Sequence, residues 1–413
     1  MRNLRLLDVY HHFTSCEPTF LPDELRWLCW FQYPFPSLPL TNMHKLVGLQ
    51  LRYGRIEHLW EGQMVMRNLK FINFYDLSFL KRLPDISGAP NIERRLRRLC
   101  LHDCCGLQKL PEDFGTMDKL EELQLGSSDY FSPFEGQVET INFHVLTNLS
   151  SLTILDLAWR QIGDEDFPKD LHGLCSLEEL NISHNSKLTQ LPASISHLSR
   201  LKHLELDECI RLQVLHALPS GLQVLKASRC KSLEKIEDLS NAHENLYMIW
   251  LLDCQKLLSK QESRRYLDMM LNETFLKKWA ALDHGLSISI PGSKIPSWFK
   301  EQDGNEIALK LHPNWQSQIL GFAICGVFKQ PTDHPYHNIK FRYERDAICD
   351  PKQRGDYDNA PTTTFANENV WIGYIPFSCF VQMHHNKHLL HDDWSNIIEG
   401  NLVVTVGLSY HKS

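Results

Sequence analysis

The sequence repeats the spacing Leu-x-x-Leu-x-Leu, in strict or variant form, across residues 25–257. Strict copies start at Leu46, Leu96, Leu120, Leu152 and Leu201, and variant copies start at Leu25, Leu69, Leu177, Leu222 and Leu246. Successive starts are 21 to 32 residues apart, with an average of about 25. Alternate residues of a short strand point to one side, so the leucines of one copy can be buried only against neighbouring copies. This feature restricts the chain to a stack of similar turns.

The period is that of leucine-rich repeats, which contribute one parallel strand each to a concave face. We therefore predict about ten repeats over residues 25–258, preceded by an N-terminal cap at residues 1–24. The position three residues after the last strand leucine should point into the stack. It is filled by Cys104, Asn185, Cys209, Cys230 and Cys254. The 32-residue interval after Leu120 predicts an inserted loop at residues 126–133, where turn-forming residues are dense.

Two changes of pattern follow the repeats. Leu267, Leu271, Phe275 and Trp279 recur every four residues, which predicts one amphipathic helix within a helical cap or linker at residues 259–283. From residue 284 short strand-like runs replace the leucine period. These runs are 286–290, 306–311, 319–328, 339–343, 370–375 and 402–408. The predicted fold class is an α/β leucine-rich-repeat solenoid followed by an all-β sandwich, of jelly-roll or Ig-like type, at residues 284–413.

The charge balance argues against two classes of partner. Lys and Arg total 43 and Asp and Glu total 50, so no cationic excess is available for a nucleic acid or an anionic membrane. The apolar run 320–328 is too short to cross a bilayer, and the N-terminus lacks the pattern of a secretory signal. Twelve Cys without a Cys-x-x-Cys pair favour a reducing compartment. We expect a cytoplasmic location, with the nucleus as a second one.

Several stretches resemble one known family. In the last third of the chain they are Gly285-Leu-Ser-Ile-Ser-Ile-Pro-Gly-Ser-Lys-Ile-Pro-Ser-Trp-Phe299, Leu311-His-Pro-Asn-Trp315, Leu320-Gly-Phe-Ala-Ile-Cys325 and Val370-Trp-Ile-Gly-Tyr374. They resemble the post-repeat domain of plant TIR-type nucleotide-binding leucine-rich-repeat resistance proteins. Residues 21–30 and 46–62 resemble the start of that family's repeat array. The resemblance implies the protein-recognition portion of an intracellular plant immune receptor, with a pathogen effector or a guarded host protein as partner in defence.

Sequence patterns of catalysis are absent from the chain. It contains no Gly-x-x-x-x-Gly-Lys-[Ser/Thr] phosphate loop, Gly-x-Ser-x-Gly, His-Glu-x-x-His or EF-hand loop. We therefore predict no enzyme activity, no cofactor, and no catalytic or metal site. The resemblance implies that NAD⁺ hydrolysis belongs to a TIR domain, which this chain lacks. The alternatives are an NAD hydrolase activity attributed from that domain and a truncated regulator that associates with full-length receptors of the same family.

Residues between the strand leucines are the candidate binding residues, because aromatic and charged side chains dominate protein interfaces. The predicted protein-binding residues are Lys70, Phe71, Tyr75, Lys202, His203, Glu205, Asp207, Tyr247 and Trp250. For the end repeats, packing beneath a cap or beneath the predicted helix is an equally weighted alternative. The basic run 93–98 is a solvated edge or, alternatively, a docking patch. A helical segment would place His384, His388 and His391 on one face as metal ligands, but we favour a solvated loop.

Overall fold

A computed structural model describes most of the repeat region and parts of the C-terminal region. The described residues are 3–10, 17–39, 43–59, 67–83, 95–107, 110–127, 143–216, 218–237, 245–281, 285–299, 306–311, 320–328, 336–344, 355–357, 368–376 and 400–409. The chain divides into two units, Met1–Leu246 and Tyr247–Ser413. The inserted loop expected at 126–133 lies, after residue 127, outside the described residues.

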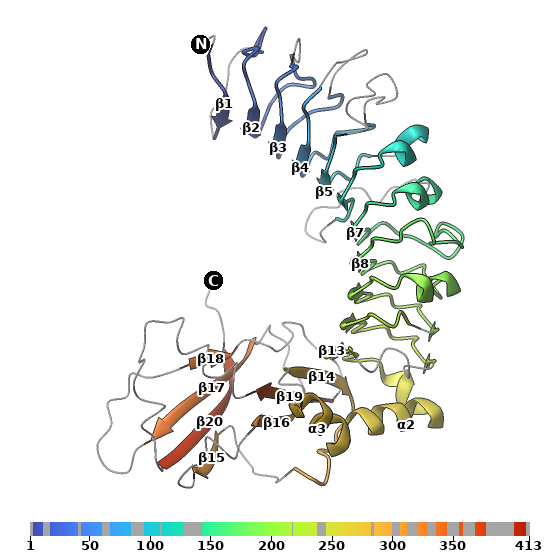
Figure 1. The fold of residues 1–413 in the computed structure, drawn as a ribbon, viewed down its shortest axis with the longest axis vertical. Helices are drawn as coiled ribbons and strands as arrows, with labels where there is room; N and C mark the ends of the chain where they lie inside the picture. The colour runs from blue at the N-terminus through green and yellow to red at the C-terminus, as the bar shows by residue number, and fades with distance from the viewer. Residues whose placement is uncertain are drawn as a thin grey trace. The chain divides into compact units, whose positions relative to one another are not determined.

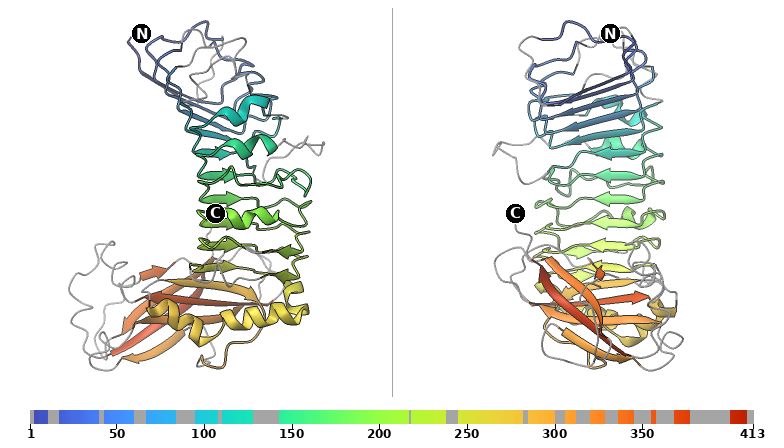
Figure 2. Two further views of the ribbon diagram at one scale, coloured as in Figure 1. Left: turned by 45° about the vertical axis from the view of Figure 1, so that its right-hand side comes forward. Right: turned by 90° about the vertical axis from the view of Figure 1, so that its left-hand side faces the viewer.

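The first unit is a solenoid in which each turn contributes one short strand, and the strands lie side by side in a parallel sheet (Figures 1 and 2). They are β1 Leu6–Val9, β2 Trp27–Phe31, β3 Gly48–Arg52, β4 Phe71–Tyr75, β5 Arg98–His102, β6 Glu122–Gln124, β7 Ile154–Asp156, β8 Glu179–Asn181, β9 His203–Glu205 and β11 Val224–Lys226. Equivalent leucine positions face each other, as in Leu49 with Ile72 and Leu155 with Leu180. The leucine period therefore sets the register.

The returning side of the solenoid holds short, irregular elements. The short strands β10 Val214–Leu215 and β12 Lys235–Ile236 pair in parallel. The 3-10 helices η1 Glu112–Thr116, η3 Phe143–Asn148 and η4 Ala193–His197 lie on the side of the solenoid away from the strands (Figure 1). The strand leucines point between these two sides, and Leu46, Leu49 and Leu51 are at most 1% exposed. Because every repeat buries its leucines against its neighbours, the core runs the length of the solenoid.

All ten strands predicted from the leucine pattern form, the tenth being β13 Met248–Trp250 in the second unit. The structure adds one more, β1, within the region predicted as an N-terminal cap. Leu4, just before this strand, and Leu7 and Val9 within it repeat the leucine spacing 21 residues before the copy that starts at Leu25. Leu7 pairs with Leu28. All three are half-buried. The pattern itself could therefore have predicted β1.

Among the described residues, nine of the eleven strands with the leucine motif, all except β1 and β6, lead into a turn that contains a residue with a left-handed φ, two positions after the last apolar residue of the motif. These residues are Gln32, Tyr53, Asp76, Asp103, Trp159, His184, Glu208, Arg229 and Asp253. A non-glycine residue in this region costs about 1–2 kcal/mol. The cost is offset because the same residue donates its N–H to the next turn, as His184 does to the Asp207 carbonyl (2.7 Å) and Glu208 to the Ser228 carbonyl (2.8 Å). A backbone ladder thus joins consecutive turns.

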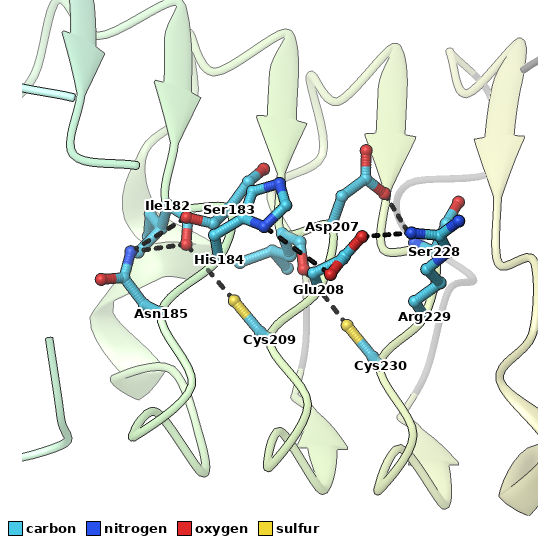
Figure 3. Close-up of polar contacts among 11 residues, drawn as sticks. Ile182, Ser183, His184, Asn185, Asp207, Glu208, Cys209, Ser228, Arg229 and Cys230 are labelled. Carbon is cyan, nitrogen blue, oxygen red and sulfur yellow. Dashed lines mark hydrogen bonds and ion pairs between the residues drawn. The ribbon is translucent and has the colours of Figure 1, made fainter. Parts of the chain in front are cut away.

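The next residue of each turn confirms the prediction that it points into the stack. Asn185, Cys209 and Cys230 are fully buried, and each donates to the carbonyl of the residue that directly follows the strand of the preceding repeat; Figure 3 shows this bond for Cys209 and Cys230. The acceptors are Leu157 for Asn185 Nδ2 (3.0 Å), Ile182 for Cys209 Sγ (3.3 Å) and Leu206 for Cys230 Sγ (3.2 Å). Cys104 and Cys254 are also fully buried. The cysteines at this position are therefore structural.

The second unit begins with β13 and continues into η5 Gln255–Ser259 and two helices, α2 Gln261–Met270 and α3 Glu273–Ala281. In one sheet, β13 pairs in parallel with β14 Leu286–Pro291, and β14, β19 Asn369–Pro376 and β16 Gly321–Phe328 are antiparallel in that order. A second sheet has the antiparallel order β15 Glu306–Leu311, β20 Gly400–Ser409, β17 Tyr336–Glu344 and β18 Gly355–Tyr357. All six strands predicted after residue 284 form; β18 was not predicted.

The prediction of one continuous helix across residues 267–279 is wrong. Helix α2 ends in a tight turn in which the Asn272 N–H donates to the Met269 carbonyl (3.1 Å). Helix α3 then starts afresh, with the Phe275 N–H donating to the Asn272 carbonyl (3.1 Å). The four-residue spacing of apolar residues continues across the break, which is why periodicity alone misses it. The domain limits predicted at residues 24, 258 and 283 stay predictions. No helix in the described part of the chain is both long and apolar enough to cross a membrane.

Removing the Asn185 amide should destabilise the solenoid strongly. The amide also donates to the Ile182 carbonyl (2.7 Å), and its Oδ1 accepts from the Ile162 N–H (2.9 Å). Asn185→Ala would leave several buried backbone groups without partners, so we expect a loss of about 2–4 kcal/mol in the urea unfolding free energy. The control is Asn245→Ala, because Asn245 is exposed and makes one side-chain bond, to the Ser220 carbonyl. Equal losses for both variants would contradict a stabilising role for the Asn185 side-chain hydrogen bonds.

Candidate functional site

The strand surface of the N-terminal repeats carries a row of neighbouring aromatic rings, one from each repeat of β1 to β5; only Tyr75 and His102 are stacked, and the other neighbours are tilted or edge-on. The rings belong to Tyr10, Phe31, Tyr53, Tyr75 and His102, and their successive centroid distances are 5.0, 5.2, 5.3 and 5.4 Å. We call these five residues the aromatic row. Tyr10 and Tyr53 are exposed and the other three are half-buried. Each repeat supplies a ring at nearly the same position, so the row follows directly from the parallel register.

A second aromatic contact lies at the start of the same strands. The Trp27 ring lies over Gly48 and is 6.0 Å from the Phe71 ring, centroid to centroid. A Cβ at position 48 would lie 2.3 Å from Trp27 Cζ3. Only glycine therefore allows the indole to cross the β3 backbone. Trp27 and Phe71 are both half-buried and offer their remaining surface on the same face as the aromatic row.

A groove of about 410 Å³ lies against the aromatic row. Its lining residues come from β3 to β6 and the turns that follow, and they are Arg52, Tyr53, Asn73, Tyr75, Cys100, His102 and Gln124. Neutral polar groups and aromatic rings predominate, with Arg52 as the one Lys or Arg in the lining. Such a groove can hold several side chains of a protein partner, and aromatic and arginine side chains are the usual anchors of such contacts.

Burial raises the pKa of two titratable groups that line the groove, Cys100 and Tyr75. Burial, reinforced by the Glu122 carboxylate, raises the pKa of the Cys100 thiol to about 12, so the thiol is protonated at neutral pH. Burial and the charge of Asp103 raise the pKa of the Tyr75 hydroxyl. The Cys100 thiol is therefore a poor nucleophile, since the thiolate is the reactive form. The residues that line the groove can form hydrogen bonds, aromatic contacts and an ion pair with a partner.

Three predicted binding residues lie at or beside this groove. Tyr75 lines it and belongs to the aromatic row, Phe71 contacts Trp27, and Lys70 is exposed one residue before β4. Arg52 and Tyr53 were not among the predicted residues. Tyr53 lies in a turn, beyond the positions between the leucines that were considered. The signal that could have found it is the recurrence of an aromatic residue at or just after the end of each of the first five strands.

A second predicted cluster, on β9, is engaged in contacts between repeats. Lys202 pairs with Glu178 (2.7 Å) and Glu205 pairs with Lys226 (2.7 Å). His203 Nδ1 lies 3.6 Å from Glu179. Asp207 accepts a hydrogen bond from the Ser228 N–H (2.6 Å), which connects two turns of the solenoid (Figure 3). Lys202, His203, Glu205 and Asp207 therefore hold neighbouring repeats together, and their role as binding residues stays a prediction.

The last two predicted residues, Tyr247 and Trp250, pack beside β14 in the second unit. The Ser287 N–H donates to the Tyr247 carbonyl (2.9 Å), and Trp250 Nε1 donates to Ser287 Oγ (3.4 Å). Trp371 Nε1 donates to the same hydroxyl (3.2 Å). These contacts place β14 beside both residues, and the alternative of packing beneath the helix stays a prediction. Both residues remain half-buried.

The basic run at 93–98 is largely paired where it is described. Arg97 pairs with Glu121, Arg98 Nε lies 3.1 Å from Glu122, and Arg95 donates to Asn68 Oδ1 (3.1 Å). The cluster His384, His388 and His391 lies outside the described residues. In the described part of the chain no group of three or more His, Cys, Asp or Glu residues could hold a metal ion.

Comparisons with known proteins give one family-model match and several relatives. The model described as the C-JID domain matches residues 290–402. Disease resistance protein RPS4B of Arabidopsis thaliana is 27% identical over 80% of this chain and 34% of its own length. TMV resistance protein N of Nicotiana glutinosa is 24% identical over 92% of this chain and 45% of its own length. The chain thus spans between a third and half of the length of these two relatives.

A solved structure gives a weaker similarity. The LRR ectodomain of the plant membrane receptor kinase GASSHO1/SCHENGEN3 from Arabidopsis thaliana matches 56% of this chain and 33% of its own, at 18% sequence identity and a TM-score of 0.32. At that score the similarity carries no argument, and the strand register alone establishes the solenoid.

The sequential parallel strands and their leucine core define a leucine-rich-repeat protein with a further β-rich unit. The C-JID match and the relatives confirm the resemblance found in the sequence. The chain is similar to the leucine-rich-repeat and C-JID region of plant TIR-type nucleotide-binding leucine-rich-repeat disease resistance proteins.

Adding a methyl group at Gly48 should displace the Trp27 indole. The new Cβ would overlap the indole ring, so we expect Gly48→Ala to lower the unfolding free energy by about 1–3 kcal/mol. The near-ultraviolet circular dichroism of the tryptophans should change in the same variant. Gly326→Ala is the matched control, because a Cβ at Gly326 would meet no atom within 4 Å. An unchanged spectrum and stability for Gly48→Ala would contradict the placement of Trp27.

The Asp207 carboxyl should make stability fall as the pH rises. Burial is the main cause that raises its pKa from 3.8 to about 6, Glu205 adds to the shift, and the bond from the Ser228 N–H opposes it. Between pH 4 and 6 the folded state therefore binds more protons than the unfolded state. Wild type should lose about 1–3 kcal/mol between pH 4 and 7 relative to Asp207→Asn. Urea unfolding across this range measures the difference, and parallel profiles would contradict it.

Proposed function

We propose that this chain is the protein-recognition portion of an intracellular plant immune receptor. It binds a pathogen effector or a guarded host protein through the strand surface of its N-terminal repeats. Its location is the cytoplasm, with the nucleus as a second one. The relatives support the receptor class, since they are named as disease resistance proteins. The groove bordered by the aromatic row is the observation that supports a binding surface.

Physical chemistry favours this surface over the rest of the first unit. Side chains on strands are held by the sheet, so an aromatic ring there loses little conformational freedom when it binds. Large aromatic side chains at the centre of an interface contribute most of its binding energy. On β9, by contrast, the lysine and glutamate side chains are already paired with neighbouring repeats. Binding there would first have to break those pairs.

The proposal gives the chain a binding role and no catalytic one. A purified chain incubated with NAD⁺ should release no nicotinamide above a buffer control. Turnover that survives repurification and scales with the concentration of the chain would overturn this part of the proposal and leave the binding surface to be tested separately.

Removing two rings of the aromatic row should weaken partner binding. Individually expressed effector and host proteins would be tested against the chain by biolayer interferometry. For each protein that binds, we expect Tyr53→Ala with Tyr75→Ala to raise the Kd at least tenfold, because two anchors of about 1 kcal/mol or more are lost. The control is His172→Ala with His197→Ala, an exposed ring pair 4.6 Å apart. It should change the Kd less than twofold.

Thermal unfolding of both double variants would establish that the solenoid remains folded. Tyr53 is exposed and Tyr75 half-buried, so their removal leaves the leucine core intact. If every partner bound the Tyr53 and Tyr75 variant as tightly as wild type, the aromatic row would have no part in recognition.

A further inference from the structure

Charge on the strand surface changes sign along the solenoid. From β1 to β5 the positions between and just after the strand leucines carry Arg5, Arg26, Arg52, Lys70, Arg97 and Arg98, against the single carboxylate Asp8. From β6 to β9 they carry Glu121, Glu122, Asp156, Glu178, Glu179, Glu205 and Asp207, against Lys202. The net charge of −7 hides this polarity, because the total sums over both halves. The groove lies mostly in the basic half.

Most cations of this surface outside the first repeats are neutralised by the next repeat along the solenoid or by the preceding one. Arg98 pairs with Glu122, Lys202 with Glu178 and Lys226 with Glu205. These contacts leave little free positive charge beyond β4. The first four repeats are different, because their strands carry few carboxylates with which a cation can pair.

Arg52 is the cation that lines the groove, and its partner is a neutral amide. With the Gln50 amide oriented so that its oxygen faces Arg52, that oxygen accepts from Arg52 Nε (2.8 Å) and Nη2 (2.7 Å). No carboxylate lies within ion-pair distance of Arg52 in the described part of the chain. The residue is exposed, so its guanidinium can turn towards a ligand. A planar guanidinium binds a carboxylate through two parallel hydrogen bonds.

Two carboxylates near the aromatic row do not cancel this charge. Asp103 is 2% exposed, accepts a hydrogen bond from Ser127 Oγ (2.9 Å) and lies 3.6 Å from His102 Nε2. Asp76 is half-buried in the turn after β4, and burial and Asp103 raise its pKa. Neither lines the groove. The Glu122 carboxylate lies beside two lining residues, Cys100 and Gln124, but it is paired with Arg98 (3.1 Å). Of the residues that line the groove, Arg52 alone carries a permanent charge.

We infer that the groove binds a partner segment in which an acidic residue stands beside a bulky apolar or aromatic residue. The acidic side chain pairs with the Arg52 guanidinium, and its neighbour packs against the rings of Tyr53 and Tyr75. The Asn73 amide lines the groove and can bind the backbone of the segment, whereas Gln124 Nε2 already donates to Glu122 (2.7 Å). The inference rests on the proposed function, because it names the chemistry of the partner at that surface. A nucleic acid fits less well, since the acidic half of the surface repels phosphates.

The test uses three fluorescein-labelled peptides of equal length. The first carries three glutamates around one tryptophan, the second has glutamine in place of each glutamate, and the third has lysine. Fluorescence anisotropy with the full chain at 50 mM NaCl should give the glutamate peptide a Kd at least fivefold lower than the glutamine peptide, with the lysine peptide weakest. Raising NaCl to 500 mM should remove most of the difference, because screening weakens exposed ion pairs.

Arg52→Gln should reduce binding of the glutamate peptide at least fivefold and leave binding of the glutamine peptide within twofold. The matched control is Lys231→Gln, which removes one exposed cation from the turn after β11 and should leave both within twofold. Arg52 is exposed, so folding is not at risk, and thermal unfolding of each variant checks this. Equal binding of the three peptides, binding of none, or an unchanged Kd in Arg52→Gln would overturn the inference. Tighter binding of a labelled oligothymidylate than of the glutamate peptide would do the same.

Failure of this inference and failure of the proposed function give different results. If a protein partner depends on Tyr53 and Tyr75 but not on Arg52, the proposed binding surface is supported and the inference of an acidic partner segment is rejected. If a glutamate peptide binds through Arg52 while no effector or host protein depends on the aromatic row, the inferred ligand chemistry is supported and the proposed receptor function is rejected.

Discussion

One hydrogen bond, repeated in consecutive turns, joins the repeats of β7, β8, β9 and β11. In the turns after β8, β9 and β11 the side chain that follows the left-handed residue donates to the carbonyl of the residue that directly follows the strand of the preceding repeat. A buried carbonyl without a partner costs about 1–3 kcal/mol. A donor at this position therefore stabilises these turns, whereas Gly54 and Leu77 occupy the same position after β3 and β4 without a side-chain donor. Asn185, Cys209 and Cys230 supply such a donor, which explains why a chain with twelve cysteines uses several of them as hydrogen-bonding core residues.

The ladder leaves the opposite side of each strand available for recognition. Leucines and turn donors hold the stack, so the residues between the leucines can vary without loss of fold. Gly48 illustrates the limit of this freedom, because the Trp27 indole covers its Cα and a side chain would collide with the ring. In the described part of β1 to β4 the positions between the leucines hold aromatic rings and cations that make no ion pair, whereas on β8, β9 and β11 they hold ion pairs. One scaffold thus carries two chemically different surfaces.

Much of the fold was predictable from the sequence, because leucine spacing reports directly on burial. The same spacing missed the break at Asn272, since apolar residues keep their period while the backbone changes course. It also could not find the groove. Tyr53 has a left-handed φ, and Arg52 bonds to the amide of Gln50 two residues earlier; neither fact is written in a hydrophobic pattern. The charged residues predicted as binding residues on and beside β9 were found correctly on the strand surface, but the sequence could not show that Lys202 and Glu205 form ion pairs with neighbouring repeats.

The turn hydrogen bond and the surface charge both change near β6. In the turn after β7, the position that Asn185 and Cys209 fill in later turns holds Arg160, which is buried and donates its Nε to the Leu125 carbonyl of the β6 repeat. Burial lowers the pKa of Arg160, and its Nη2 has no hydrogen-bond partner among the described residues. Burying a guanidinium costs several kcal/mol unless it is compensated. The interval from Leu120 to Leu152 is the longest in the array, and Glu121 and Glu122 begin the acidic half. Near β6, therefore, the side chain that joins consecutive turns changes to arginine and the surface charge changes from positive to negative. The groove also ends there, at Gln124 of β6.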